Sequence, residues 1–201
     1  QPLAPVGNPA MHPKPAEALY AELKSVPGKY SYASSGVGTS LHLGGELLKQ
    51  QGGLDMLHVP YRTGTQIVND LSGNQLDLAV LPLSMVMQQA RAGKILVYGV
   101  MSDKPSPAMP EVPPLASVPA WRGANVTVWQ GVFAPKGTPT QIVERLNTAL
   151  GQVLANPSVR KNFEDGGVTP MGAGPREFAA FVKSEESKFG AIVTKGNIKA
   201  E

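Results

Sequence analysis

The chain has 201 residues, which permits one large domain or two small ones, and 42% of them are hydrophobic, enough to form a buried core. A net charge of +3 without blocks of Lys or Arg, together with 6% aromatic residues, disfavours nucleic-acid binding, which requires a concentrated basic face. The absence of cysteine excludes disulfides, Cys-ligated zinc and a Cys nucleophile.

Strand and helix patterns alternate along the first hundred residues. Helices are predicted over residues 15–25, 37–51, 65–71 and 83–92, and strands over residues 29–33, 56–59, 76–81 and 95–100. Pairs such as Gly52-Gly53 mark helix ends. The last two strands are largely apolar, as strands covered on both faces are. The alternation predicts an α/β architecture with a mostly parallel sheet.

A proline-rich stretch over residues 102–119 then predicts a long irregular loop with at most one helical turn. After it we expect a strand over 127–134 and a helix over 139–154, with Thr138 as its N-cap. A helix over 158–164, a short strand over 168–170 and a final helix over 175–195 complete the chain. The proline-rich loop and the strand after it are the expected domain boundary.

The strongest local feature is a loop between a predicted strand and a predicted helix, called the serine loop below: Ser34, Ser35, Gly36, Val37, Gly38, Thr39 and Ser40. Its glycines permit a tight turn, while its hydroxyls and the free N–H groups of the following helix point toward one place. Such a loop suits a carboxylate or a phosphate, although a plain strand-to-helix turn is an equally good interpretation. It matches neither the phosphate-binding G-K-[ST] motif nor G-x-G-x-x-G.

Two further loops follow predicted strands, at Tyr61-Arg62-Thr63-Gly64 and at residues 81–84. Loops after parallel strands gather at one edge of a sheet, where ligands bind, so Tyr61 is a candidate wall of the site. Trp129 is a second candidate, with core packing as the more common role of a tryptophan.

The three histidines do not have metal-ligand spacing, and we expect neither a metal nor a cofactor. His42 lies one turn into the helix after the serine loop, where it either lines the site or packs against the sheet. His58 is expected to be structural and His12 exposed. No convincing nucleophile–base pair is visible, so no catalytic residue is predicted.

Six ordered segments resemble the tripartite tricarboxylate transporter substrate-binding proteins, also called the Bug family. The first resembles the family's Y-x-S-x-G-x-G-[ST]-x-x-H-L-x-x-E motif, and the similarity extends over nearly all of the chain. The segments are residues 32–46, the HVPYR segment from His58 with Gly64, residues 70–77, the ARAGK segment 90–94, the proline-rich residues 105–113, and WQGVFAPKGTP over 129–139.

The resemblance implies a periplasmic binding protein whose two α/β domains close on a small carboxylate and deliver it to membrane transporter subunits. Residues 1–125 would form the second domain, and residues 126–201 the crossover strand and C-terminal helices of an incomplete first domain. The implied ligand contacts come from the serine loop, with His42, Tyr61 and Trp129 nearby. Leu81-Pro82-Leu83 stands where the family often has a polar residue, so a polar contact is expected to be lost or moved there.

Because the family's N-terminal portion has no counterpart here and no signal peptide is visible, we expect a fragment, a truncated chain or a shortened paralogue. A natural truncation favours an alternative: a sensor or protein-interaction module without transport. A sheet edge left open by the missing portion would allow a homodimer. An enzyme is the least favoured interpretation, because the sequence shows no catalytic constellation.

Overall fold

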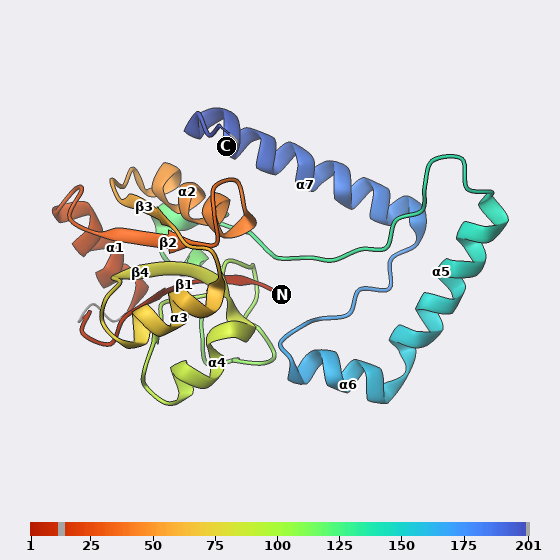
Figure 1. Ribbon diagram of the computed structural model, residues 1–201, viewed down its shortest axis with the longest axis horizontal. Helices are drawn as coiled ribbons and strands as arrows, with labels where there is room; N and C mark the ends of the chain where they lie inside the picture. Colours follow the sequence, from red (N-terminus) through yellow and green to blue (C-terminus); the bar gives the residue numbers. More distant parts are fainter. Residues whose placement is uncertain (12–14, 200–201) are drawn as a thin grey trace.

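The computed structural model describes residues 1–11 and 15–199, so His12 lies outside the described residues (Figure 1). The first half of the chain forms one five-stranded sheet in the order β3-β2-β4-β1-β5. Its strands are β1 (Leu3–Gly7), β2 (Ser31–Ser34), β3 (Leu57–Pro60), β4 (Leu78–Pro82) and β5 (Leu96–Val97). The α/β fold predicted from the alternating pattern is confirmed.

The first four helices connect and cover these strands, three more follow in the C-terminal part, and most begin where the sequence placed them. They are α1 (Ala16–Ser25), α2 (Ser40–Gly52), α3 (Gly64–Ser72), α4 (Leu83–Arg91), α5 (Thr140–Ala155), α6 (Pro157–Asp165) and α7 (Pro175–Gly196). The proline-rich loop carries two short 3₁₀ turns rather than one helical turn, η1 (Leu115–Ser117) and η2 (Pro119–Trp121). Asn156 caps α6 by accepting hydrogen bonds from the amides of Ser158 and Val159.

The sheet is mixed rather than mostly parallel. β2 runs parallel to both β3 and β4, as predicted, but β1 runs antiparallel to β4 and to β5. The sequence pattern did not predict β1, because proline, here Pro5, lacks an N–H and is rare in inner strands. The Pro5 carbonyl accepts a hydrogen bond from the Tyr98 amide at 3.1 Å, so the chain beyond β5 still follows β1.

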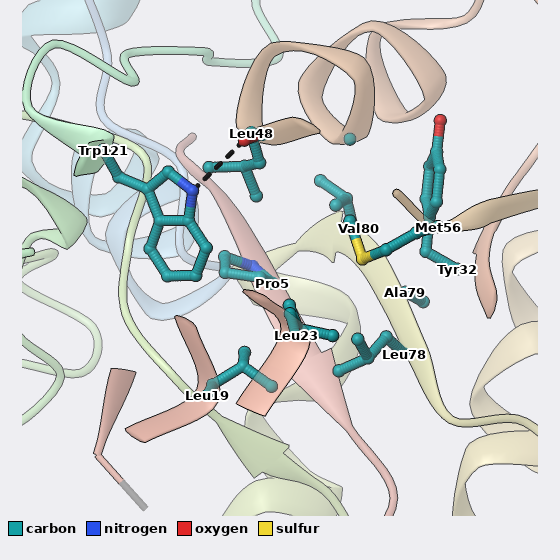
Figure 2. Close-up of a pocket in the computed structure, with 11 residues that line it drawn as sticks. Pro5, Leu19, Leu23, Tyr32, Leu48, Met56, Leu78, Ala79, Val80 and Trp121 are labelled. Carbon is teal, nitrogen blue, oxygen red and sulfur yellow. Dashed lines mark hydrogen bonds between the residues drawn. The ribbon is translucent and has the colours of Figure 1, made fainter. Parts of the chain in front are cut away.

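The core lies on both sides of this sheet, and the proline-rich loop contributes to it. Trp121 is 1% exposed, and its indole N–H donates to the carbonyl of Leu48 at 3.2 Å (Figure 2). A cavity of about 20 Å³ beside it has only apolar exposed surface and offers a water little to bind. It is lined by Pro5, Leu19, Leu23, Tyr32, Gly45, Leu48, Met56, Leu78, Ala79, Val80 and Trp121.

The C-terminal part differs most from the sequence prediction. The strands expected over 127–134 and 168–170 do not form; residues 128–135 are extended, and Thr127 makes only an isolated bridge to Pro2. Residues 126–128 pair only with the chain just before β1, through hydrogen bonds of Val128 with Gln1 and of the Leu3 amide with the Val126 carbonyl. Beyond Val128 the segment has no ladder partner among the described residues. In Figure 1 it leads away from the sheet to α5 and α6, and α7 then returns to lie on α2.

Close packing between α2 and the sheet depends on Gly45. A Cβ at this position would overlap the ring of Tyr32, whereas a Cβ at Gly151 in α5 would meet nothing within 4 Å. We expect Gly45→Ala to destabilise the protein by about 1–3 kcal/mol through overpacking. Gly151→Ala should be neutral or stabilising by up to about 1 kcal/mol through helix propensity. Urea denaturation measures both, and equal effects of the two substitutions would contradict this packing.

Candidate functional site

The serine loop joins β2 to α2 and folds back on the first turn of the helix. Gly36 and Gly38 adopt φ values of +119° and +77°, which favour glycine and produce the bend. The Thr39 hydroxyl donates to the Gly36 carbonyl at 2.8 Å and accepts from the His42 amide at 3.3 Å, so Thr39 is the N-cap of α2. The loop is therefore a closed turn at a helix N-terminus.

Several donors of this turn have no partner among the described residues. The backbone N–H groups of Ser35, Val37 and Ser40 make no hydrogen bond there, and neither do the hydroxyls of Ser35 and Ser40. All three residues are partly exposed. Free N–H groups and the partial positive charge of a helix N-terminus attract anions. Chemically, this face can bind a carboxylate or a phosphate.

Ser34 does not belong to that open face. Its side chain is fully buried, and its hydroxyl lies 2.7 Å from Nε2 of His58 and donates to the Gly36 carbonyl at 3.1 Å. The hydroxyl also accepts from the Gly36 amide at 3.3 Å. The structure thus places Ser34 behind the loop, where it fixes the turn from inside.

His42 also lies behind the loop. Its side chain is 7% exposed, and Nδ1 accepts a hydrogen bond from the Gly38 amide at 3.1 Å. This bond assigns the neutral ring hydrogen to Nε2, which lies 4.0 Å from Oε1 of Glu46. The ring stacks on His58 with the ring centroids 4.0 Å apart. We call Ser34, His42 and His58 the histidine cluster; the sequence indicated a role near the site for His42 but only a structural one for His58.

Burial controls the charges around this cluster. Desolvation lowers the pKa of His42, and desolvation followed by the nearby His42 lowers the pKa of His58 to about 4. Desolvation acts to raise the pKa of Glu46, but hydrogen bonds from Lys49 and Tyr32 hold it below its usual value. Both rings are therefore neutral at pH 7 while Glu46 is ionised.

Tyr61 lies directly beside the serine loop, because its amide donates to the Ser34 carbonyl at 2.8 Å. Its hydroxyl donates to Oδ2 of Asp70 at 2.8 Å, and desolvation together with this bond raises its pKa. Spacing along the chain could not reveal this bond, because it joins a side chain of the loop after β3 to one of α3. An open polar groove follows, lined by Pro60, Tyr61, Arg62, Gln66, Asn69 and Asp70.

Trp129 is not brought into this arrangement by any contact that the structure shows. Its ring packs edge-on against Phe178 and Phe181 of α7, with centroids 5.9 and 5.3 Å away. Leu81 in β4 and Leu83 at the start of α4 are fully buried, and their side chains offer no polar group to the edge. Among the described residues, no group of His, Asp or Glu side chains could hold a metal ion.

The family model described as tripartite tricarboxylate transporter family receptor matches residues 2–198. The chain belongs to this family. A curated relative from Pseudomonas sp., the UPF0065 protein in the tcbD–tcbE intergenic region, is 36% identical over 174 residues. The match covers 87% of this chain and 52% of the relative, so the chain spans about half of that relative's length.

Solved structures of receptors like this one share the fold. A structure described as a periplasmic transporter is 37% identical with a TM-score of 0.86, and the match covers 98% of this chain and 66% of that one. A Rhodopseudomonas palustris protein with adipate is 25% identical with a TM-score of 0.87, over 98% of this chain and 66% of that one. MatC from the same organism, with bound malate, is 26% identical with a TM-score of 0.82, over 96% and 66%.

The depressed pKa of His58 predicts that acid destabilises this chain. The folded state favours the neutral ring, so its contribution is complete above the unfolded pKa of about 6.5 and is lost as pH falls toward about 4. Between pH 7 and pH 5 we expect a loss of about 1 kcal/mol from this ring, a value reduced because the ring is only partly buried. Urea denaturation at both pH values measures it.

His58→Gln is the matched variant, since the amide can still bond to Ser34 but does not titrate. Its stability should change less between pH 7 and pH 5 than that of the native chain. An identical loss in both proteins would assign the acid sensitivity to other groups.

Proposed function

We propose that this receptor chain is the ligand-binding part of a periplasmic solute-binding protein that captures a small carboxylate for a tripartite tricarboxylate-type transporter. The observation that carries the proposal is the set of donors on the open face of the serine loop, at the N-terminus of α2, that have no partner among the described residues. A carboxylate placed there would receive hydrogen bonds from Ser35, Val37 and Ser40 without any rearrangement of the turn.

The chemistry of the relatives supports this choice. The two R. palustris structures contain adipate and malate, which both carry two carboxylates. Charge-assisted hydrogen bonds contribute about 1.5–3 kcal/mol each, so two or three support micromolar affinity after the cost of association. In this proposal Gly36, Gly38 and Thr39 shape the turn, Tyr61 forms a wall, and Ser34 and His42 support the loop from behind. Trp129 as a ligand contact stays a prediction.

Capture rather than catalysis fits the site. Among the described residues, Ser34 and His58 most resemble a nucleophile–base pair, but the Ser34 hydroxyl is buried beneath the loop. A substrate on the open face would not reach it without opening of the turn. The donors that do face outward are hydroxyls and amides with no base beside them among the described residues, which bind an anion but do not activate a nucleophile.

The two-domain division at residue 126 remains our proposal. The sheet is complete by Val97, and within the part of the chain that the structure describes residues 129–135 belong to no ladder. α5 carries an exposed apolar stripe with Ile142, Leu146 and Val153 each at 50–52% exposure, a kind of face that complete domains bury. Delivery to transporter membrane subunits and pairing into a homodimer also remain predictions. Within the described residues, no helix has the length and apolar character that a membrane span requires.

Limited proteolysis tests this division. Lys136 is exposed, in a turn that follows the extended segment and precedes α5, so trypsin should cut first after Lys136. The 1–136 product should keep the sheet and melt cooperatively, because it retains the core. Mass spectrometry identifies the site, with Lys136→Gln as the control. A first cut within residues 1–125 would contradict the proposed boundary.

Thermal unfolding with a panel of acids tests carboxylate capture. Amino acids, di- and tricarboxylates including malate and adipate, and aromatic acids would each be added to the chain. A ligand at 100 times its Kd adds about 2.7 kcal/mol. At this size the melting temperature should rise by about 5–11 °C. A panel without any shift would contradict capture by this chain.

Ser40→Asp sharpens the test. A carboxylate at the first turn of α2 suits the helix dipole, so stability should be unchanged or slightly higher, while repulsion should abolish the ligand-induced shift. Thr140→Asp makes an equivalent change at the first residue of α5 and should leave the shift intact. Retained binding by Ser40→Asp would exclude the serine loop as the site.

A further inference from the structure

We propose that His42 and His58, as a neutral stacked pair, are positioning residues that hold the serine loop in its ligand-accepting conformation. The proposal rests on the function above, since it explains how the open face of that loop is kept in place. Neither ring contacts the open face itself: both point at atoms on the inner side of the turn. The pair would act on a ligand only through Gly38 and Ser34.

The first contact fixes the tip of the loop. Gly38 is exposed and has no neighbour within 4 Å of its Cβ position, so packing does not restrain it. Its amide is held by a single hydrogen bond, to Nδ1 of His42. Because this N–H is directed inward, the tip cannot rotate freely, and the amides of Val37, just before it, and of Ser40, two residues after it, keep one orientation. His42 thus determines which N–H groups remain available.

The second contact fixes the start of the loop. The Ser34 hydroxyl is hydrogen-bonded to Nε2 of His58. It also donates to the Gly36 carbonyl and accepts from the Gly36 amide. With Nε2 of His58 as the donor, the hydroxyl hydrogen is free for the Gly36 carbonyl. The Gly36 carbonyl also accepts from Thr39, so the His58 bond is connected to the N-cap of α2.

The stacked and partly buried arrangement favours the neutral form of both rings. At a centroid separation of 4.0 Å, two charged rings would repel strongly, and burial penalises even one charge. The charged and titratable groups that face the pair are Glu46 and Lys49 of α2 and Tyr32 of β2. Glu46 would favour a protonated ring, but it is already bonded to Tyr32 and Lys49, and Lys49 opposes the additional charge.

A proton on Nδ1 of His42 would reverse the first contact. The nitrogen would become a donor facing the Gly38 N–H, so the tip would lose its anchor and the open face its fixed orientation. We therefore expect the loop to loosen in acid before the domain unfolds. This pH dependence would not follow if the rings served only as packing.

The test compares the native chain with His42→Asn and His42→Leu. Asparagine can place Oδ1 near the position of Nδ1 and accept from Gly38, whereas leucine fills space without an acceptor. The readout is the hydrogen-exchange protection of the Gly38 amide by NMR, corrected for intrinsic rates, from pH 7 down to about pH 4, because burial lowers the pKa of His42 and that of His58 to about 4. Adipate and malate titrations by calorimetry on the same three proteins give the effect on binding.

We expect protection to fall about fivefold in His42→Leu and to survive in His42→Asn, since one net hydrogen bond is at stake. Protection should fall with pH in the native chain but not in His42→Asn. Equal protection in all three proteins, equal loss in both variants, or a flat native pH profile would overturn the proposal. If the native chain binds neither adipate nor malate, the proposed function fails for these acids, while the Gly38 exchange still decides the positioning role.

Discussion

The parallel pairing of β2 with both β3 and β4 is the constraint on which the site depends. It brings the loops after these strands to one edge of the sheet, so that Tyr61 meets the Ser34 carbonyl directly. The same pairing sets Tyr32 beside His58 in register, which places the second histidine under the serine loop. A one-residue slip would turn every one of these side chains to the other face of the sheet.

α2 transmits this constraint from the sheet to the loop. Gly44 and Gly45 let the helix approach the sheet closely, against Leu3, Val80 and the ring of Tyr32. Larger residues would move the helix away from the sheet. The N-terminus of α2, with its free donors, would then move away from β2, the strand that precedes it. The Tyr32 hydroxyl bonds to Glu46 at 2.7 Å, so the core and the polar network behind the loop meet in one side chain.

The C-terminal part is held in place by few buried side chains. α7 is attached to α2 through buried Ile192 and a bond from Gln50 to its carbonyl. α5 and α6 have no fully buried residue, and an aromatic group of Trp129, Phe133, Phe178 and Phe181 is the main packing of the extended segment. Apolar surface that stays exposed contributes little to stability. The first half of the chain therefore carries most of the fold's stability, and the serine loop is built entirely within it.

Sequence alone determined the features whose cause is local: the alternation of elements, the glycine-dependent turn, the helix it precedes, and the ordered motifs that identify the family. Tertiary structure decided what depends on distant partners. β1 forms although Pro5 opposes it, because β4 and the chain around β5 supply its hydrogen bonds. Residues 127–134 have the composition of a strand, but beyond the short pairing of Thr127 and Val128 with the N-terminus they have no ladder partner among the described residues. His58 and Asp70 acquire their roles from Ser34 and Tyr61, since a side chain's partner across a sheet is set by register and not by spacing along the chain.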